Sequence, residues 1–230
     1  MRLRPGDPEA LHMISALGGR PKPKRASNGY VRDHFDAFAE HFDESLVDDL
    51  KYQVPKLLYK TAKKFIVNGN AYSSMLDLGV GTGLVGLTFK PSVKNIWGVD
   101  LSTEMARKAR KRGVYKAVAV AEITKYLKKN KRKYDIVTAA DVLIYFGDVS
   151  SIFKGVGNIL NDEGIFVLSA ESKKNGTYKL TKSGRYSHSL AYLEQEGINA
   201  GLKVLSHRVK RLRFELGKPV MGHIMLFSKK

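Results

Sequence analysis

The sequence predicts an α/β fold in which a doubly wound, mostly parallel sheet of seven strands ends in an antiparallel hairpin. Two observations carry this expectation. Short strand-like runs alternate with helical runs from residue 74 onward, and the chain closes with two long strand-like runs around a Gly-Lys-Pro turn. Alternation of this kind is typical of βαβ units. The 230 residues, 43% of them hydrophobic, suffice for one compact core but not for two full-sized domains.

The N-terminal third is expected to be helical. Residues 8–17 have the apolar spacing of a short helix closed by glycines, and residues 18–27 form a basic linker with nothing to bury. Residues 28–70 are a predicted helical cap, in which Pro55 separates two helices that end near Val67. The sequence therefore divides into three parts: 1–27, 28–70, and a sheet domain over 71–230.

Five strand-like runs lie within the sheet domain, at residues 74–79, 95–101, 116–120, 134–141 and 164–171. Residues 173–189 are expected to be a polar loop, followed by a helix to about residue 200 and by the hairpin, with its turn at 217–219. The two hairpin strands must be antiparallel to each other. A Rossmann-like sheet that ends in a reversed strand is therefore predicted, in place of a sixth parallel strand.

Charge is the largest compositional anomaly, with a formal net charge of +18. Residues 103–133 hold 12 basic and 2 acidic residues, which predicts either a solvated charged face or a surface for RNA or a ribosomal partner. The absence of cysteine excludes disulfides and thiolate chemistry, and the histidines show no metal-ligand spacing, so no metal is predicted. No apolar run is long enough to span a membrane, so we expect a soluble intracellular protein, cytoplasmic or organellar.

A glycine-rich turn directly follows the first strand, with Gly79, Gly81 and Gly83. Three glycines allow the backbone to turn tightly and approach a ligand. Asp77 lies two residues before the first glycine, where a carboxylate repels a pyrophosphate and attracts an ammonium group. This favours S-adenosylmethionine, which carries an ammonium and a sulfonium but no phosphate, over a dinucleotide; a plain tight turn is the structural alternative.

Two further carboxylates end the next two strands in register with the glycine turn. Asp100 is placed to accept hydrogen bonds from ribose hydroxyls, and Glu122 from an adenine amino group. A nicotinamide dinucleotide would use Asp100 as well, so an NAD-dependent oxidoreductase stays open as an alternative.

These motifs resemble those of class I S-adenosylmethionine-dependent methyltransferases. The resemblance rests on DLGVGTG at 77–83, GVDLS at 98–102, AVAEI at 119–123 and YDIVTAADVLIYFGD at 134–148. A narrower resemblance, to predicted methyltransferases that follow tetratricopeptide repeats, rests on residues 30–36, 183–189 and the closing hairpin. The wider resemblance implies a cofactor site made of Asp77, Gly79, Gly81 and Gly83 around the methionine, Asp100 and Leu101 at the ribose, Glu122 and Ile123 at the adenine, and Ala140 with Asp141 at the methyl group.

Candidate acceptor residues come from the cap and from residues 183–189. His188 is a candidate general base because an imidazole titrates near neutral pH, and Asp141 is the second catalytic candidate. The substrate-binding candidates are Tyr30, His34, Tyr145, Arg185 and Tyr186. The structural alternatives are a satisfied core histidine for His188 and a loop-capping acid for Asp141. The rings of the cap, Tyr30, His34, Phe35 and Phe42, either form a lid over the cofactor or pack in the core, and core packing is favoured for Phe35 and Phe42.

The function predicted from the sequence is S-adenosylmethionine-dependent methyl transfer to a small or medium-sized acceptor. A noncatalytic or RNA-directed basic protein with the methyltransferase fold, acting on or near the ribosome, is the alternative; it uses the basic helices at 107–133.

Overall fold

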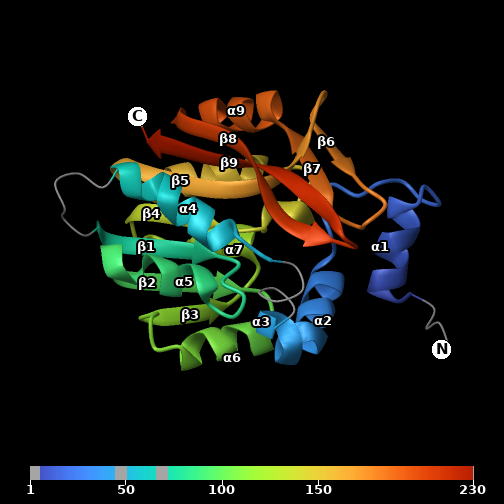
Figure 1. The fold of residues 1–230 in the computed structure, drawn as a ribbon, viewed down its shortest axis with the longest axis horizontal. Coiled ribbons are helices and arrows are strands. Elements are labelled where there is room, and N and C mark those ends of the chain that lie inside the picture. Colours follow the sequence, from blue (N-terminus) through green and yellow to red (C-terminus); the bar gives the residue numbers. More distant parts are fainter. Residues whose placement is uncertain (1–5, 45–50, 66–71, 230) are drawn as a thin grey trace.

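The computed structural model describes residues 6–44, 51–65 and 72–229. A nine-stranded sheet runs through them in the order β3-β2-β1-β4-β5-β7-β6, with β9 paired to β5 and β8 paired to β9 (Figure 1). The strands are β1 (Tyr72–Leu78), β2 (Val93–Asp100), β3 (Ala117–Val120), β4 (Tyr134–Ala139), β5 (Leu160–Lys173), β6 (Tyr178–Leu180), β7 (Tyr186–Ser189), β8 (Leu202–Glu215) and β9 (Lys218–Lys229).

Strands β1 to β5 form the parallel half, because β1 lies between β2 and β4, while β3 and β5 lie outside them. Helices cover both faces, as neighbouring residues of β3 show: Val118 packs with α6, and Ala119 faces the cluster that contains Leu127 of α7. The helices within the sheet domain are α5 (Leu84–Phe89), α6 (Thr103–Lys111), α7 (Ile123–Lys129), α8 (Ser150–Ile159) and α9 (Leu190–Asn199), with short 3-10 turns η5 (Lys90–Ser92) and η6 (Leu143–Tyr145).

The sheet contains two short strands, β6 and β7, in addition to the seven that were predicted. Both lie within residues 173–189, so the prediction of a loop there is wrong. Strand β7 pairs parallel to the end of β5, and β6 pairs antiparallel to β7. All four residues of β7 are buried although its sequence is Tyr-Ser-His-Ser. Because buried polar side chains replace the usual apolar alternation, the strand pattern is hidden at this point.

The closing hairpin confirms the predicted reversed strands, with β9 antiparallel to both β5 and β8. Its turn lies at Leu216 and Gly217, slightly earlier than predicted, and both residues have positive φ, 47° and 73°. Two central residues with positive φ are the mark of a type I′ turn, whose twist matches that of the flanking strands.

The described N-terminal region consists of α1 (Pro8–Ala16), α2 (Asn28–Phe38), η1 (Ala39–His41), α3 (Phe42–Glu44), α4 (Val54–Ala62) and η3 (Lys63–Phe65). Asp36 of α2 accepts hydrogen bonds from the Ser102 hydroxyl at 2.5 Å and from the Glu104 amide at 3.2 Å. These bonds fix the cap over the start of α6. The expected helix end near Val67 and the boundary between residues 70 and 71 lie outside the described residues.

The predicted linker at 18–27 is not free of the domain. Arg25 forms a β-bridge with Phe146, and the Ala26 amide donates to the Tyr145 carbonyl at 2.8 Å. Ala26 is buried. This short extended segment therefore forms part of the wall beside η6. Within the described ranges, no helix is long and apolar enough to cross a membrane.

Candidate active site

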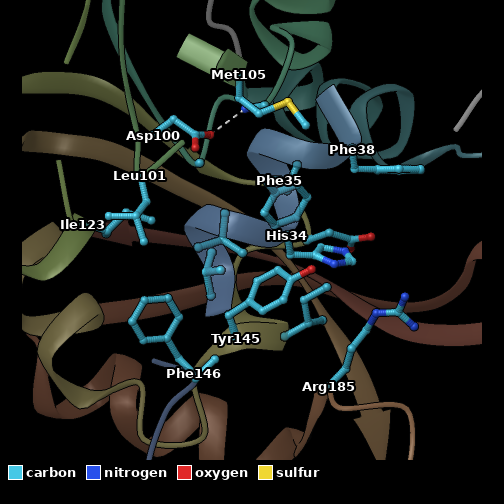
Figure 2. A pocket seen from close by; sticks show the side chains of 18 of the residues that line it. His34, Phe35, Phe38, Asp100, Leu101, Met105, Ile123, Tyr145, Phe146 and Arg185 are labelled. Atoms are coloured by element: carbon cyan, nitrogen blue, oxygen red, sulfur yellow. Dashed lines mark hydrogen bonds between the residues drawn. The ribbon is translucent and has the colours of Figure 1, made fainter. Parts of the chain in front are cut away.

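A cavity lies where the carboxyl ends of the parallel strands meet the cap, the position at which open α/β sheets bind ligands. Figure 2 shows rings from α2 facing residues from η6, from the end of β2 and from the start of α7. Eleven of the sixteen candidate residues line it: His34, Gly79, Gly81, Asp100, Leu101, Glu122, Ile123, Ala140, Asp141, Tyr145 and Arg185. The remaining five, Tyr30, Asp77, Gly83, Tyr186 and His188, do not.

The glycine turn is built as predicted, with φ values of 65°, 54° and 96° at Gly79, Gly81 and Gly83. A Cβ at Gly79 would lie 2.6 Å from Val142 Cγ2, so a side chain there is excluded by both φ and space. Gly83 is turned away from the cavity, because it begins α5 and faces Tyr115 and Arg112. Only the first two glycines of the turn therefore line the cavity.

Asp100 engages the turn directly. The Gly81 amide donates to its Oδ2 at 2.8 Å, and the Ser102 amide donates to its Oδ1 at 2.9 Å. Burial raises the pKa of this carboxyl, whereas the backbone hydrogen bonds lower it. The amide that a diphosphate would use at this turn is already committed to a carboxylate.

Asp77 lies behind the turn and not in the cavity. It is fully buried, its Oδ1 accepts from the Thr138 hydroxyl at 2.7 Å, and its Oδ2 accepts from the Tyr115 hydroxyl at 2.8 Å. Burial raises its pKa to about 7, against the effect of these two hydrogen bonds. Its position does not support the expected direct contact with a ligand ammonium; Asp77 instead ties β1 to β4 and to the segment before β3.

Glu122 lines the cavity but also begins α7, where it accepts from the Thr124 and Lys125 amides at 3.0 and 2.9 Å. Arg25 Nη1 donates to its Oε1 at 2.9 Å. Burial favours a raised pKa, but these hydrogen bonds outweigh it and lower the pKa of Glu122. Around it, this end of the cavity is apolar, with Leu101, Met105, Ile123 and Phe146 drawn in Figure 2.

The opposite end carries polar atoms that have no hydrogen-bond partner in the described part of the chain. His34, Tyr145 and Arg185 lie close together there (Figure 2), and Tyr52 completes the lining. Among the described residues, nothing hydrogen-bonds to the His34 imidazole or to the hydroxyls of Tyr52 and Tyr145. Burial lowers the pKa of His34, an effect that Glu9 opposes and Arg185 reinforces, and this favours the neutral imidazole. This end can therefore meet a protic ligand.

His188, the predicted base, lies outside the cavity. It is fully buried, donates its Nε2–H to the Phe146 carbonyl at 2.8 Å, and stacks on Tyr192 with the ring planes 11° apart. Burial lowers its pKa to about 4. The geometry supports the structural alternative for this residue.

Two of the substrate candidates are packing residues as well. Tyr186 is fully buried and donates its hydroxyl to the Pro23 carbonyl at 2.7 Å. The ring of Tyr30 stacks on His12 at 4.5 Å, and His12 in turn donates to the Gly184 carbonyl at 2.7 Å. The segments 30–36 and 183–189 thus meet through α1.

Asp141 lines the cavity in a left-handed conformation, with φ of 53°. Its carboxylate is fully engaged: Oδ1 accepts from the Ser169 hydroxyl at 2.8 Å and Oδ2 from Arg213 Nη1 at 2.9 Å. Arg213 also pairs with Glu171. Asp141 is therefore held in place at the lip of the cavity and is not free to act as a base.

Several lining residues were missed by the sequence reasoning. Phe35 and Phe42, interpreted as core residues in preference to a lid, line the cavity together with Phe38, and their helical spacing on residues 35–42 was the available signal. Arg213 gave no signal, because it is one of five lysines and arginines between 203 and 213. The lining residues that were not among the candidates from the sequence include Arg25, Phe35, Phe38, Phe42, Tyr52, Met105, Val142, Phe146 and Arg213.

Part of the sheet domain is similar to a known protein family. Residues 76–168 match the family model of a methyltransferase domain. A curated relative, the ubiquinone biosynthesis O-methyltransferase of Haemophilus ducreyi, is 23% identical over 125 residues, or 51% of this chain. The match spans about half the length of that relative, 53%.

Solved structures share the fold over most of the chain. The N-methyltransferase NodS of Bradyrhizobium japonicum, in complex with S-adenosylhomocysteine, has a TM-score of 0.68 at 13% identity and covers 86% of this chain and 98% of its own. Magnesium protoporphyrin IX methyltransferase of Synechocystis, with bound S-adenosylmethionine, has a TM-score of 0.65 at 16% identity and covers 88% and 97%. These comparisons confirm the predicted fold class and support the predicted enzyme class.

Proposed function

We propose that the chain is an S-adenosylmethionine-dependent methyltransferase acting on a small or medium-sized acceptor. The observation that carries the proposal is the Gly81–Asp100 hydrogen bond in a cavity that Glu122 and Asp141 also line. Arg25 and Arg213 already neutralise Glu122 and Asp141, whereas the Asp100 carboxylate has no cationic partner in the described ranges. This carboxylate suits a ligand that offers hydrogen-bond donors there and carries no phosphate. Two of the similar solved structures hold S-adenosylmethionine or S-adenosylhomocysteine, which agrees with this assignment.

The residues present fit that cofactor. The free oxygen lone pairs of Asp100 are those available to ribose hydroxyls, and the apolar end beside Ile123 suits an adenine ring. Gly79 and Gly81 allow close approach of the methionine part. When bound, the cofactor supplies a methyl group activated by a sulfonium.

The chain's own contribution is alignment, exclusion of water and removal of a proton. The rings of Phe35, Phe38 and Phe42 cover the cavity and keep water out. His34 is the base candidate that the geometry favours over His188, because its neutral imidazole faces the cavity without a hydrogen-bond partner among the described residues. A hydroxyl or amine acceptor would lose its proton to this ring.

The rival functions have less support. A dinucleotide would bring its diphosphate against Asp100, and α5, with six residues, is a short helix for binding it. A noncatalytic role does not explain why polar atoms of His34, Tyr52 and Tyr145 line the cavity with no hydrogen-bond partner in the described ranges.

The test is calorimetric titration with S-adenosylmethionine, S-adenosylhomocysteine and NAD. We expect the first two to bind and NAD not to. Asp100→Asn should weaken binding at least about tenfold, because one of the two hydrogen-bond-accepting oxygens that serve the ribose and the turn, and its negative charge, are lost. Asp135→Asn is the matched control: Asp135 also accepts a backbone hydrogen bond, from Ser74, but at the opposite ends of the strands. Tighter binding of NAD than of S-adenosylhomocysteine would refute the proposal.

A further inference from the structure

The segment 103–133 contains most of the excess charge of the protein. Its 12 basic and 2 acidic residues give +10 of the total of +18. Both acids are already engaged, since Glu104 pairs with Arg107 at 2.8 Å and Glu122 pairs with Arg25 at 2.9 Å. The segment therefore has no acid of its own left to neutralise its other lysines and arginines.

The twelve basic residues divide into two groups. Arg107, Lys108 and Arg112 are half-buried, and they pair with Glu40, Glu104 or Asp43, which fixes α6 to the cap. The other nine are exposed and have no acidic partner in the described ranges. We call these nine residues the β3-edge basic face: Arg110, Lys111, Lys116, Lys125, Lys128, Lys129, Lys131, Arg132 and Lys133.

The name follows from their place in the fold. Strand β3 is the free edge of the sheet, at the end remote from the hairpin of β8 and β9 (Figure 1). Helices α6 and α7 cover opposite faces of the sheet beside this edge. The nine cations therefore flank the edge on both sides and continue along the segment that leads into β4.

A purely structural role does not account for nine charges. An edge strand is protected from pairing by one or two lysines, and Lys116 at the start of β3 already serves this purpose. Like charges at this density repel one another and destabilise the folded chain. A polyanion would relieve that repulsion.

A nucleic acid fits this face better than a membrane does. Val120 is the one large exposed hydrophobic residue within 103–133, so an apolar surface for lipid is lacking in this described segment. The described part of this face also presents no free ring for stacking unpaired bases. The Trp97 ring lies under the Arg132 guanidinium at 4.2 Å, the Tyr115 hydroxyl is bonded to Asp77, and Tyr126 packs against the main core cluster. This points to phosphates and not to bases.

We propose that the β3-edge basic face binds the phosphate backbone of a nucleic-acid duplex, without sequence preference. The proposal involves none of the lining residues of the cavity, so it is independent of the proposed methyl transfer. Binding of this kind releases counterions, and its affinity falls steeply with salt.

The experiment is fluorescence anisotropy of the whole protein with a labelled RNA duplex of about 20 base pairs, from about 50 to 300 mM salt. The face variant replaces Lys125, Lys128, Lys129 and Lys131 by Gln. The matched control replaces four exposed lysines of α4 and η3 by Gln, namely Lys56, Lys60, Lys63 and Lys64. We expect the face variant to bind at least about tenfold more weakly, with a salt slope reduced by about one per lysine, and the control to change less than about threefold.

Further arms decide the kind of partner. A DNA duplex of the same sequence should bind within about threefold of the RNA duplex, because backbone phosphates are common to both. Equal loss in the face variant and the control would overturn the proposal, as would the absence of binding at low salt. Competition by poly-glutamate as strong, charge for charge, as by the duplex would assign the face to acidic proteins instead. S-adenosylhomocysteine affinity, measured for both variants, separates this result from the fate of the proposed function.

Discussion

The strand ends around the glycine turn and the region where β5, β7 and β9 meet are organised differently. At the turn, residues from β1 and β2 reach the cavity from short neighbouring segments, and Gly79, Gly81 and Asp100 lie where their spacing predicts. Near β7, neighbours in space come from distant parts of the chain, as Arg213 does when it reaches Asp141 and Glu171. Local sequence motifs therefore predict the residues of the first region but not those of the second.

The largest expected effect tests the second region. Arg213→Met leaves the carboxylates of Asp141 and Glu171 buried and unpaired, and should lower the free energy of unfolding by about 3–5 kcal/mol, as measured by urea denaturation at pH 7. Arg208→Met, at an exposed position of the same strand, should change it by less than about 0.5 kcal/mol. Similar values for the two variants would show that the ion-pair cluster does not hold this region together.

Asp77→Asn tests the region of the glycine turn, because Asp77 is buried behind that turn. A carboxyl whose pKa is raised from 3.8 to about 7 on folding takes up a proton in the folded state, so its contribution to stability falls as the pH rises from about 4 to 7. The difference between wild type and variant should change by as much as about 4 kcal/mol across that window. Urea denaturation at pH 4.5 and 8, roughly the ends of the window, measures it.

A flat difference between the two proteins would mean that Asp77 is ionised in the fold. Asp77→Asn should also retain S-adenosylhomocysteine binding within about tenfold, whereas Asp100→Asn should not. A larger loss of affinity in Asp77→Asn than in Asp100→Asn would instead support the direct ligand contact that the sequence predicts for Asp77.

Gly79→Ala tests the turn itself. The added methyl group would lie 2.6 Å from Val142 Cγ2, and the alanine would have to adopt a φ of 65°. Because the turn must shift to relieve both, affinity for S-adenosylhomocysteine should fall at least about 100-fold in calorimetry. Gly113→Ala is matched in φ, 68°, but has open space around the new Cβ. Its affinity should stay near that of the wild type, and a comparable loss there would assign the effect to general backbone strain.

The smallest effect distinguishes the two histidines. In NMR titrations, His188 should show a pKa of about 4 and no response to S-adenosylhomocysteine, because it is buried against Phe146. His34 should titrate below 6.5 and shift when the cavity is filled, since its ring lies in the lining, where Glu9, Arg185, Tyr30 and Tyr145 are the titratable or charged groups near it. Gln variants of each assign the signals. A response of His188 alone would return the base role to it.

The sequence by itself determined the doubly wound class of the sheet, the glycine turn, and the places of Asp100 at the end of β2 and Glu122 just after β3, because these depend on spacing within successive βαβ units. The depth of each side chain was decided only by the tertiary structure. Asp77 and Asp100 both end parallel strands, yet Tyr115 and Thr138 enclose the first, while the second reaches the cavity. The displaced His188 and the inserted Arg213 share one physical reason: each is fixed by contacts between segments far apart in the chain, which no local periodicity records. The two missed strands pair with near neighbours in the chain, and the buried polar residues of β7 hide its strand pattern.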